Sequence, residues 1–192
     1  HPQLANTSTT IQNPEIDNSK GAIFFDRDGT INKDVGYLNN VNDIHIPKEN
    51  LETISKLSEL NLFNIIVSNQ SGVGLGYFDT KMVKKINDEI SRTINKNNGR
   101  IDKIYFDTST NENSSKDRKP NIGMILKARK DFNISLRKSW VIGDKYSDIE
   151  LGKKCNMRTI YIKNNKYGYK SNVKPDFTIN KLPESLKIIK NL

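Results

Sequence analysis

Short apolar runs alternate with longer amphipathic segments along this chain, and this alternation restricts the fold more than any other feature. Five runs are rich in β-branched or aromatic residues and fit buried strands; they span residues 22–25, 63–67, 104–106, 140–142 and 159–162. The segments between them repeat apolar residues at helical spacing; these segments are residues 51–60, 82–94, 120–129 and 147–154. Residues 177–179 fit an edge strand, and residues 183–191 fit a last short helix.

Strict alternation of strand and helix predicts right-handed crossovers and a parallel sheet with helices on both faces. The expected fold is therefore α/β, with three α/β/α layers of the Rossmannoid type. One domain accounts for 192 residues, since domains usually contain roughly 100 to 200 residues. We place this domain at residues 21–192. Residues 1–20 are polar and show no periodicity, so we interpret them as a flexible segment or a linker.

The composition excludes several classes of protein. Cys155 is the only cysteine, so an internal disulfide is impossible and a reducing cytoplasm is the expected location. No stretch approaches the ~20 apolar residues of a membrane span, and we expect no membrane contact. The net charge of +9 fits an anionic ligand such as a phosphorylated metabolite or a nucleic acid. A general excess of lysine along the chain would explain this charge equally well.

Polar side chains follow three of the predicted strands. They are Asp26 and Asp28 after the first strand, Ser68, Asn69 and Gln70 after the second, and Asp144 and Lys145 after the fourth. Ligands of parallel α/β sheets bind outside the carboxyl ends of the strands. Arg118 and Lys119 precede a predicted helix and can reach the same edge. The sequence thus predicts one site built from several strand ends.

The acidic residues of this site require a cation. Two carboxylates about 4 Å apart repel each other by on the order of 4 kcal/mol at an effective dielectric constant of about 20. Asp26, Asp28 and Asp144 offer oxygen ligands only, which select a hard ion, and Mg²⁺ is the one that commonly pairs with substrate phosphate. Lys119, Arg118 and Lys145 would then supply the positive charge that a phosphoryl group needs during transfer.

The two neighbouring aspartates suit different tasks. A carboxylate at a strand end, Asp26, can attack phosphorus and form an aspartyl-phosphate. Asp28 can protonate the leaving alcohol and later deprotonate water. The structural alternatives are a simple turn after a strand for the pair Asp26 and Asp28, an ordinary loop for residues 68–70, and a solvated helix start for Lys145 and Asp148.

Four motifs resemble those of the haloacid dehalogenase (HAD) superfamily of phosphatases, in the same order along the chain. They are FFDRDGTI, VSNQSG, RKP and GDKYSD. More narrowly, DRDGTIN with GYL, SNQSGVGLGYF and RKPNIGM are similar to the D-glycero-D-manno-heptose 1,7-bisphosphate phosphatases and to the related histidinol-phosphate phosphatases. The resemblance implies a HAD-like fold, and the length leaves no room for a large cap domain.

The resemblance also implies roles for individual residues. Asp26 matches the nucleophile and Mg²⁺ ligand, Asp28 the acid/base that also coordinates through its carbonyl, and Asp144 the remaining metal carboxylate. The residues matched to substrate binding are Ser68, Asn69, Gln70, Arg118, Lys119 and Lys145. Asp148 matches a supporting position beside the metal.

One departure concerns the segment from Phe106 to Pro120. Family members commonly carry a Cys/His zinc loop here, whereas FDTSTNENSSKDRKP has no Cys or His. We therefore expect no zinc, and a loop that is shorter, more mobile or held by hydrogen bonds of Asp107, Ser and Asn side chains.

These features lead to one expected function and several alternatives. We expect a monomeric, Mg²⁺-dependent phosphatase that removes the C7 phosphate of a heptose bisphosphate, on a route to nucleotide-activated heptose for surface polysaccharide. The expected partner is a small phosphorylated sugar, not a nucleic acid. The alternatives are a histidinol-phosphate phosphatase, a polynucleotide 3′-phosphatase and a non-catalytic protein that binds phosphate.

Overall fold

The computed structural model describes residues 18–192, and its centre is a six-stranded sheet in which every neighbouring pair is parallel. The strand order is β3-β2-β1-β4-β5-β6. The strands are β1 (Ala22–Phe25), β2 (Phe63–Asn69), β3 (Lys103–Asp107), β4 (Trp140–Gly143), β5 (Arg158–Ile162) and β6 (Phe177–Ile179). All six predicted strands are confirmed, and β2 to β5 each extend by one or two residues beyond their apolar runs.

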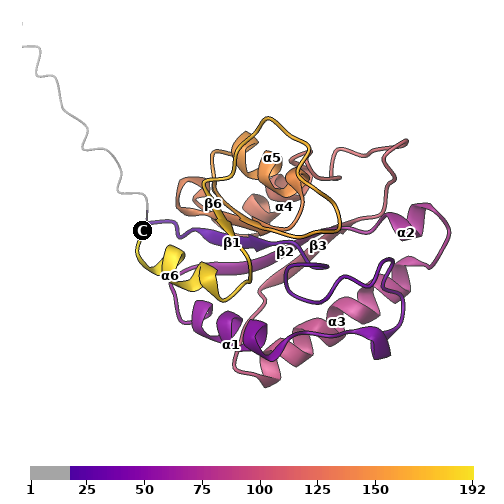
Figure 1. Cartoon of the computed structure of the whole chain (residues 1–192), viewed down its shortest axis with the longest axis horizontal. Helices are drawn as coiled ribbons and strands as arrows, with labels where there is room; N and C mark the ends of the chain where they lie inside the picture. Colours follow the sequence, from indigo (N-terminus) through magenta and orange to yellow (C-terminus); the bar gives the residue numbers. More distant parts are fainter. Residues whose placement is uncertain (1–17) are drawn as a thin grey trace, which may run out of the picture.

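Helices cover both faces of the sheet, as the alternation predicted (Figure 1). They are α1 (Lys48–Leu57), α2 (Ser71–Gly74), α3 (Thr80–Lys96), α4 (Gly123–Asp131), α5 (Tyr146–Lys154) and α6 (Glu184–Lys190). In Figure 1, α1, α3 and α6 lie below the sheet, and α4 and α5 lie above it. Two short 3-10 turns, η1 (Val41–Asp43) and η2 (Leu136–Lys138), complete the connections.

Strand β1 shows how one apolar run supplies two cores. All four of its side chains are fully buried. Ile23 and Phe25 join the cluster under α1, α3 and α6, whereas Ala22 and Phe24 join the cluster under α4 and α5. Successive side chains of a strand point to opposite faces, so a central strand covered on both sides must be apolar throughout.

The strand order reverses at β1, which lies between β2 and β4. The first crossover leads from β1 to β2, and the chain later returns to place β4 on the other side of β1. The carboxyl ends of these strands therefore meet at a switch point, where α/β sheets bind their ligands.

One helix begins later than the sequence indicated. We expected the third amphipathic helix to start at Pro120, but α4 begins at Gly123. The backbone N–H of Asn121 donates to the carbonyl of Arg118, 2.8 Å away, so a turn occupies the predicted first residues of the helix. This turn sets the direction in which Arg118 and Lys119 enter the site.

Lys20 already contacts the folded part of the chain. Lys20 forms a β-bridge with Ile134, and its ammonium group lies 4.0 Å from the centre of the Phe63 ring. The proposed segment 1–20 falls mostly outside the described residues, so the division at residue 20 stays a prediction. None of the helices in residues 18–192 has the length and apolar character of a membrane span.

The described residues form a single sheet, with no second folded unit inserted into it. The connection between β1 and α1 contains only the turn η1. We call residues 32–47 the flap, because they lie beside the carboxyl end of β1.

The central position of β1 leads to a test of stability. Ile23→Ala should lower the free energy of unfolding by about 2–5 kcal/mol, because it leaves a cavity in a core that cannot collapse fully. Val35→Ala on the flap, where Val35 is 50% exposed, is the matched control and should cost less than about 0.5 kcal/mol. Urea unfolding followed by circular dichroism measures both, and equal midpoints would contradict this view of β1.

Candidate active site

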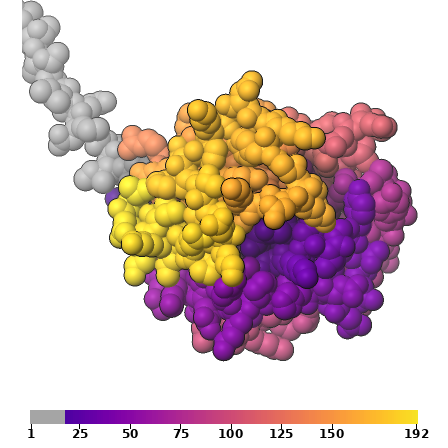
Figure 2. Space-filling view, in the orientation of Figure 1, coloured from indigo at the N-terminus to yellow at the C-terminus, as the bar shows by residue number. Residues whose placement is uncertain are grey.

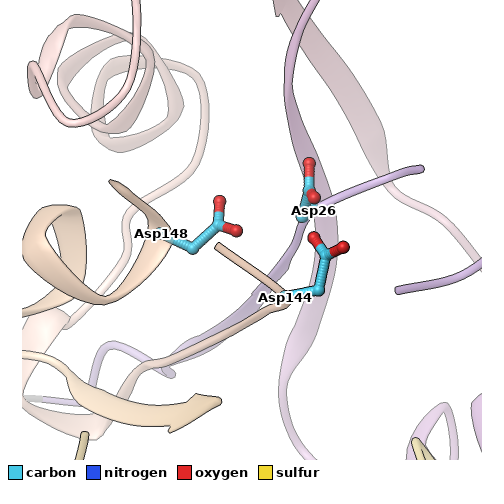
Figure 3. A group of neighbouring side chains, drawn as sticks. All are labelled: Asp26, Asp144 and Asp148. Atoms are coloured by element: carbon cyan, nitrogen blue, oxygen red, sulfur yellow. The ribbon is translucent and has the colours of Figure 1, made fainter. Parts of the chain in front are cut away.

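Three buried carboxylates meet where β1 and β4 end (Figure 3). Asp26 follows β1, Asp144 follows β4, and Asp148 reaches them from the first turn of α5. One oxygen of each carboxylate lies within 4.8 Å of the other two. The Oδ1 atom of Asp144 is buried and has no hydrogen-bond partner among the described residues.

Lys119 places a single ammonium group inside this cluster. Its Nζ donates to Asp26 Oδ1 at 2.9 Å, to Asp148 Oδ1 at 2.8 Å and to the Val67 carbonyl at 2.7 Å. Burial disfavours the charged form of Lys119, but Asp148 and Asp26 outweigh it and raise its pKa. For Asp26, burial is likewise outweighed by Lys119 and Lys145, which lower its pKa. Asp26 is thus held as an ionised carboxylate.

The other two carboxylates are short of positive charge. Burial, with the neighbouring charge of Asp26, raises the pKa of Asp144 to about 9. Burial and Asp26 also raise the pKa of Asp148 to about 6, although Lys119 opposes them. The cluster therefore carries more negative charge than Lys119 can balance.

A divalent cation fits this arrangement. The donors are carboxylate oxygens only, which suits a hard ion such as Mg²⁺. Gly29 leaves room beside Asp144, since a Cβ atom at this position would lie 2.2 Å from Asp144 Oδ2. With the unpartnered Asp144 Oδ1, this identifies Asp26, Asp144 and Asp148 as candidate ligands.

The carboxylate of Asp28 lies outside this cluster. Arg27, which is fully buried, donates from Nε to Asp28 Oδ1 at 2.9 Å and from Nη2 to Oδ2 at 3.0 Å. Asn32 Nδ2 also donates to Asp28 Oδ1, at 2.9 Å. The carboxylate cluster therefore contains Asp148 where the predicted metal set had Asp28, because the bidentate Arg27 pair holds the Asp28 side chain elsewhere. Coordination through the Asp28 carbonyl stays a prediction.

The second motif supports Lys119 and Asp28. Asn69 Oδ1 accepts from the Lys119 backbone N–H at 2.9 Å, and Asn69 Nδ2 donates to the Lys119 carbonyl at 3.1 Å. Gln70 Nε2 donates to Ser68 Oγ at 2.7 Å and to Asp28 Oδ2 at 3.2 Å. The structure thus brings all three predicted residues to the site, but the amides of Asn69 and Gln70 are used within the protein.

Hydrogen bonds organise the loop that lacks Cys and His, which is one of the three possibilities that the sequence left open. Ser109 and Ser115 both donate from Oγ to the carboxylate of Asp107. Arg118 Nη1 donates to the Ser109 carbonyl at 2.9 Å, and its Nη2 donates to Asn111 Oδ1 at 2.9 Å. The loop therefore holds Arg118 at the edge of the site.

A cleft of two adjoining cavities opens beside the cluster. Their volumes are about 380 and 410 Å³. Arg118, Lys119 and Lys145 line the first, and Asp28, Gln70 and Lys145 line the second. Most predicted site residues thus share one cleft, whereas Asp26, Ser68 and Asp144 are buried and line neither cavity.

Several residues near the site carried no assignment in the sequence. In the sequence, Arg27 stood out only as part of the motif FFDRDGTI, and the pattern did not show which carboxylate its guanidinium group would bind. Tyr167 lies in the loop of residues 163–176, which we call the β5–β6 loop; its hydroxyl donates to Asp34 Oδ2 of the flap at 2.6 Å. Tyr167 gave no signal because its partner Asp34 is distant in the sequence, and Arg27 gave none because a sequence does not show where a side chain points.

The unbalanced cluster leads to a test with Mg²⁺. Asp144→Asn should leave the metal-free protein at least as stable as the wild type, because it removes a carboxylate beside Asp26. Mg²⁺ at 100 times its Kd should stabilise the wild type by roughly 2.7 kcal/mol, and the variant much less. Thermal melts with and without MgCl₂ measure this, with Asp43→Asn on the exposed turn η1 as control. An equal Mg²⁺ effect in Asp144→Asn would refute the assignment.

The space at Gly29 provides a second test. Gly29 has a φ of +86°, and Gly36 on the flap has a φ of +79° with no atom within 4 Å of an added Cβ. Both alanine variants carry the cost of a left-handed backbone, roughly 1–2 kcal/mol. Only Gly29→Ala should also lose the Mg²⁺ effect, because its Cβ displaces Asp144. Melts of the two variants that respond equally to Mg²⁺ would contradict this.

Known proteins resemble this chain in sequence. Residues 117–187 match the family model described as HAD-hydrolase-like. The D-glycero-alpha-D-manno-heptose-1,7-bisphosphate 7-phosphatase of Burkholderia mallei is 34% identical over 145 residues, which are 72% of this chain and 77% of that protein. The D-glycero-beta-D-manno-heptose-1,7-bisphosphate 7-phosphatase of Helicobacter pylori is 35% identical over 136 residues, 70% of this chain and 79% of that protein.

A solved structure shows the same fold. The D,D-heptose 1,7-bisphosphate phosphatase of B. bronchiseptica, complexed with magnesium and phosphate, superposes with a TM-score of 0.78 at 20% identity. The match covers 89% of this chain and 98% of that one. Together with the sequence relatives, the motifs and the sheet, this leads to one conclusion: the chain belongs to the HAD superfamily, in the family of the heptose-1,7-bisphosphate 7-phosphatases.

Proposed function

We propose that this protein is a Mg²⁺-dependent phosphatase that removes the C7 phosphate of D-glycero-D-manno-heptose 1,7-bisphosphate. The observation that carries the proposal is the contact of Lys119 Nζ with Asp26 and Asp148 inside a cluster of three buried carboxylates. This arrangement offers a nucleophile, a cation site and a positive charge within one cleft.

Asp26 is the proposed nucleophile. An oxygen of its carboxylate attacks phosphorus, the bond between phosphorus and the sugar oxygen breaks, and an aspartyl-phosphate forms. The charges of Lys119 and Lys145 outweigh the effect of burial and keep this carboxylate ionised, and the contact with Lys119 fixes its direction. A bound Mg²⁺, held by Asp26 and Asp144 beside Asp148, would offset the negative charge of the phosphate.

Asp28 is the proposed acid and base. It donates a proton to the leaving sugar oxygen in the first step. In the second step it accepts a proton from the water that attacks the aspartyl-phosphate, which returns Asp26 to its free form. Arg27, Asn32 and Gln70 hold the Asp28 carboxylate at the wall of the cleft, which supports this role.

The proposed contacts to the transferred phosphate come from Ser68 and Lys119, and those to the rest of the substrate from Arg118 and Lys145. Asn69 and Gln70 act on the substrate indirectly, because their amides hold Lys119, Ser68 and Asp28. We also propose that the enzyme needs no zinc, since Asp107, Ser109 and Ser115 already join the two ends of the loop.

The family relationship supports the choice of substrate. Relatives with 34% and 35% identity are named for the alpha and the beta anomer of heptose 1,7-bisphosphate. The product would serve the synthesis of nucleotide-activated heptose. The test must therefore include both anomers.

Asp26→Asn tests the mechanism. It should lower kcat for any phosphate ester by roughly a thousandfold or more, because the covalent route is lost. Phosphate release in the presence of Mg²⁺ measures this, and circular dichroism checks that the variant folds. Asp43→Asn, at an exposed position outside the cleft, should keep wild-type activity. Turnover by Asp26→Asn near the wild-type level would refute the nucleophile.

A substrate panel tests the specificity of the wild type. The panel contains both heptose bisphosphate anomers, histidinol phosphate and a 3′-phosphorylated oligonucleotide. The proposal requires the highest kcat/KM for one of the heptose anomers. A preference for histidinol phosphate or for the oligonucleotide would replace it with that activity, and no turnover of any ester would favour a phosphate-binding protein.

A further inference from the structure

The first cavity of the cleft differs in charge from the second. Arg118, Lys119, Lys145 and Lys170 line it, and none of its lining residues is acidic. The second cavity contains Asp28 and Asp34 as well as Lys145 and Lys166. The first cavity is therefore the more favourable place for an anionic group.

The cations of the first cavity are not all neutralised. Lys119 is paired with Asp26 and Asp148. In the described part of the chain, Arg118, Lys145 and Lys170 form no ion pair: no carboxylate oxygen lies within 4.0 Å of their side-chain nitrogens. Arg118 is bound by neutral acceptors only, the Ser109 carbonyl and Asn111 Oδ1. Three positive charges thus line the cavity without a carboxylate at ion-pair distance, although Lys145 is near enough to Asp26 to lower its pKa. Such a set attracts a phosphate dianion.

The β5–β6 loop completes this cavity. Tyr167 lines both cavities, and the centre of its ring lies 4.6 Å from the ammonium group of Lys145. Asp34 of the flap accepts from the Tyr167 hydroxyl and pairs with Lys166 at 3.3 Å. Figure 2 shows this loop, in golden orange, lying against the indigo N-terminal part of the domain. The loop is therefore tied across the cleft and carries Lys170 to the cavity.

The loop is also attached to the proposed cation site. Asn164 Nδ2 donates to the backbone carbonyl of Asp144 at 2.5 Å. The β5–β6 loop thus contacts both a candidate metal ligand and the flap, so a bound substrate that touches either of them would also affect the loop.

We propose that this cavity binds a second phosphate group of the substrate, and that Lys170 of the β5–β6 loop determines the preference for bisphosphates over monophosphates. The proposal rests on the proposed function, because it assigns the phosphate that is not transferred. The transferred phosphate lies at Asp26 and Lys119, and Lys119 also lines the first cavity. A substrate with two phosphates on a short carbon chain can thus occupy both places.

Lys170→Ala and Lys170→Glu test this inference. Lys174→Ala is the matched control, since Lys174 is an exposed lysine of the same loop that lines neither cavity. The substrates are heptose 1,7-bisphosphate, fructose 1,6-bisphosphate and p-nitrophenyl phosphate, which has a single phosphate. We expect Lys170→Ala to raise KM for the bisphosphates roughly tenfold, as for the loss of one charge-assisted contact. We expect a larger effect for Lys170→Glu.

The controls define the specific effect. Lys174→Ala should match the wild type on all substrates, and the Lys170 variants should change KM for p-nitrophenyl phosphate less than about threefold. An unchanged KM for bisphosphates in both Lys170 variants would overturn the inference. An equal rise for p-nitrophenyl phosphate would also overturn it, because it would reflect the general charge of the cleft. Circular dichroism confirms that the variants fold.

The outcomes separate this inference from the proposed function. If the wild type hydrolyses only fructose 1,6-bisphosphate and Lys170→Ala raises that KM, the heptose assignment fails and the second-phosphate site stands. If heptose bisphosphate is the best substrate and the Lys170 variants leave its KM unchanged, the heptose assignment stands and the second-phosphate site fails. A 3′-phosphorylated dinucleotide is the last substrate of the panel. If the Lys170 variants raise KM for this substrate alone, the second phosphate does not belong to a sugar bisphosphate.

Discussion

The buried contact of Lys119 with Asp26 and Asp148 organises the whole site. A lysine at this depth requires compensation, because an unpaired ammonium group is costly to remove from water. Two carboxylates contact it and Asp144 is the third member of the cluster, so the cluster keeps an excess of negative charge that a divalent cation would balance. Asn69 fixes the backbone of Lys119 from both sides. One ion cluster therefore joins the ends of β1, β2 and β4 to the start of α5.

The parallel sheet makes this cluster possible. Asp26 and Asp144 are more than a hundred residues apart in the sequence, yet they follow neighbouring strands that end at the same edge. The apolar strands hold their positions firmly, since both faces of β1 are packed. Rigid strand ends carry the proposed reacting groups, and residues of the flap and the β5–β6 loop line the cleft. Such a division lets loops determine substrate choice without disturbing the chemistry.

Much of this could be predicted from the sequence, for physical reasons. Apolar runs of the right length located every strand. The start of α4 was misplaced, because a proline fits the first turn of a helix and also a loop, and local preference cannot separate these. For the loop without Cys and His, the sequence left three possibilities open, and the contacts of Ser109 and Ser115 with Asp107 support the hydrogen-bonded one.

The sequence by itself determined the fold class, the edge of the sheet that carries the site, and the residues gathered there, because these depend on periodicity and on position relative to a strand. Only the tertiary structure decided how those residues are paired. It gave the third place in the carboxylate cluster to Asp148 and bound Asp28 to Arg27. It also brought Tyr167 to Asp34 across the cleft. Tyr167 and Asp34 belong to separate segments, and even for the neighbours Arg27 and Asp28 no local pattern specifies the direction in which each side chain points.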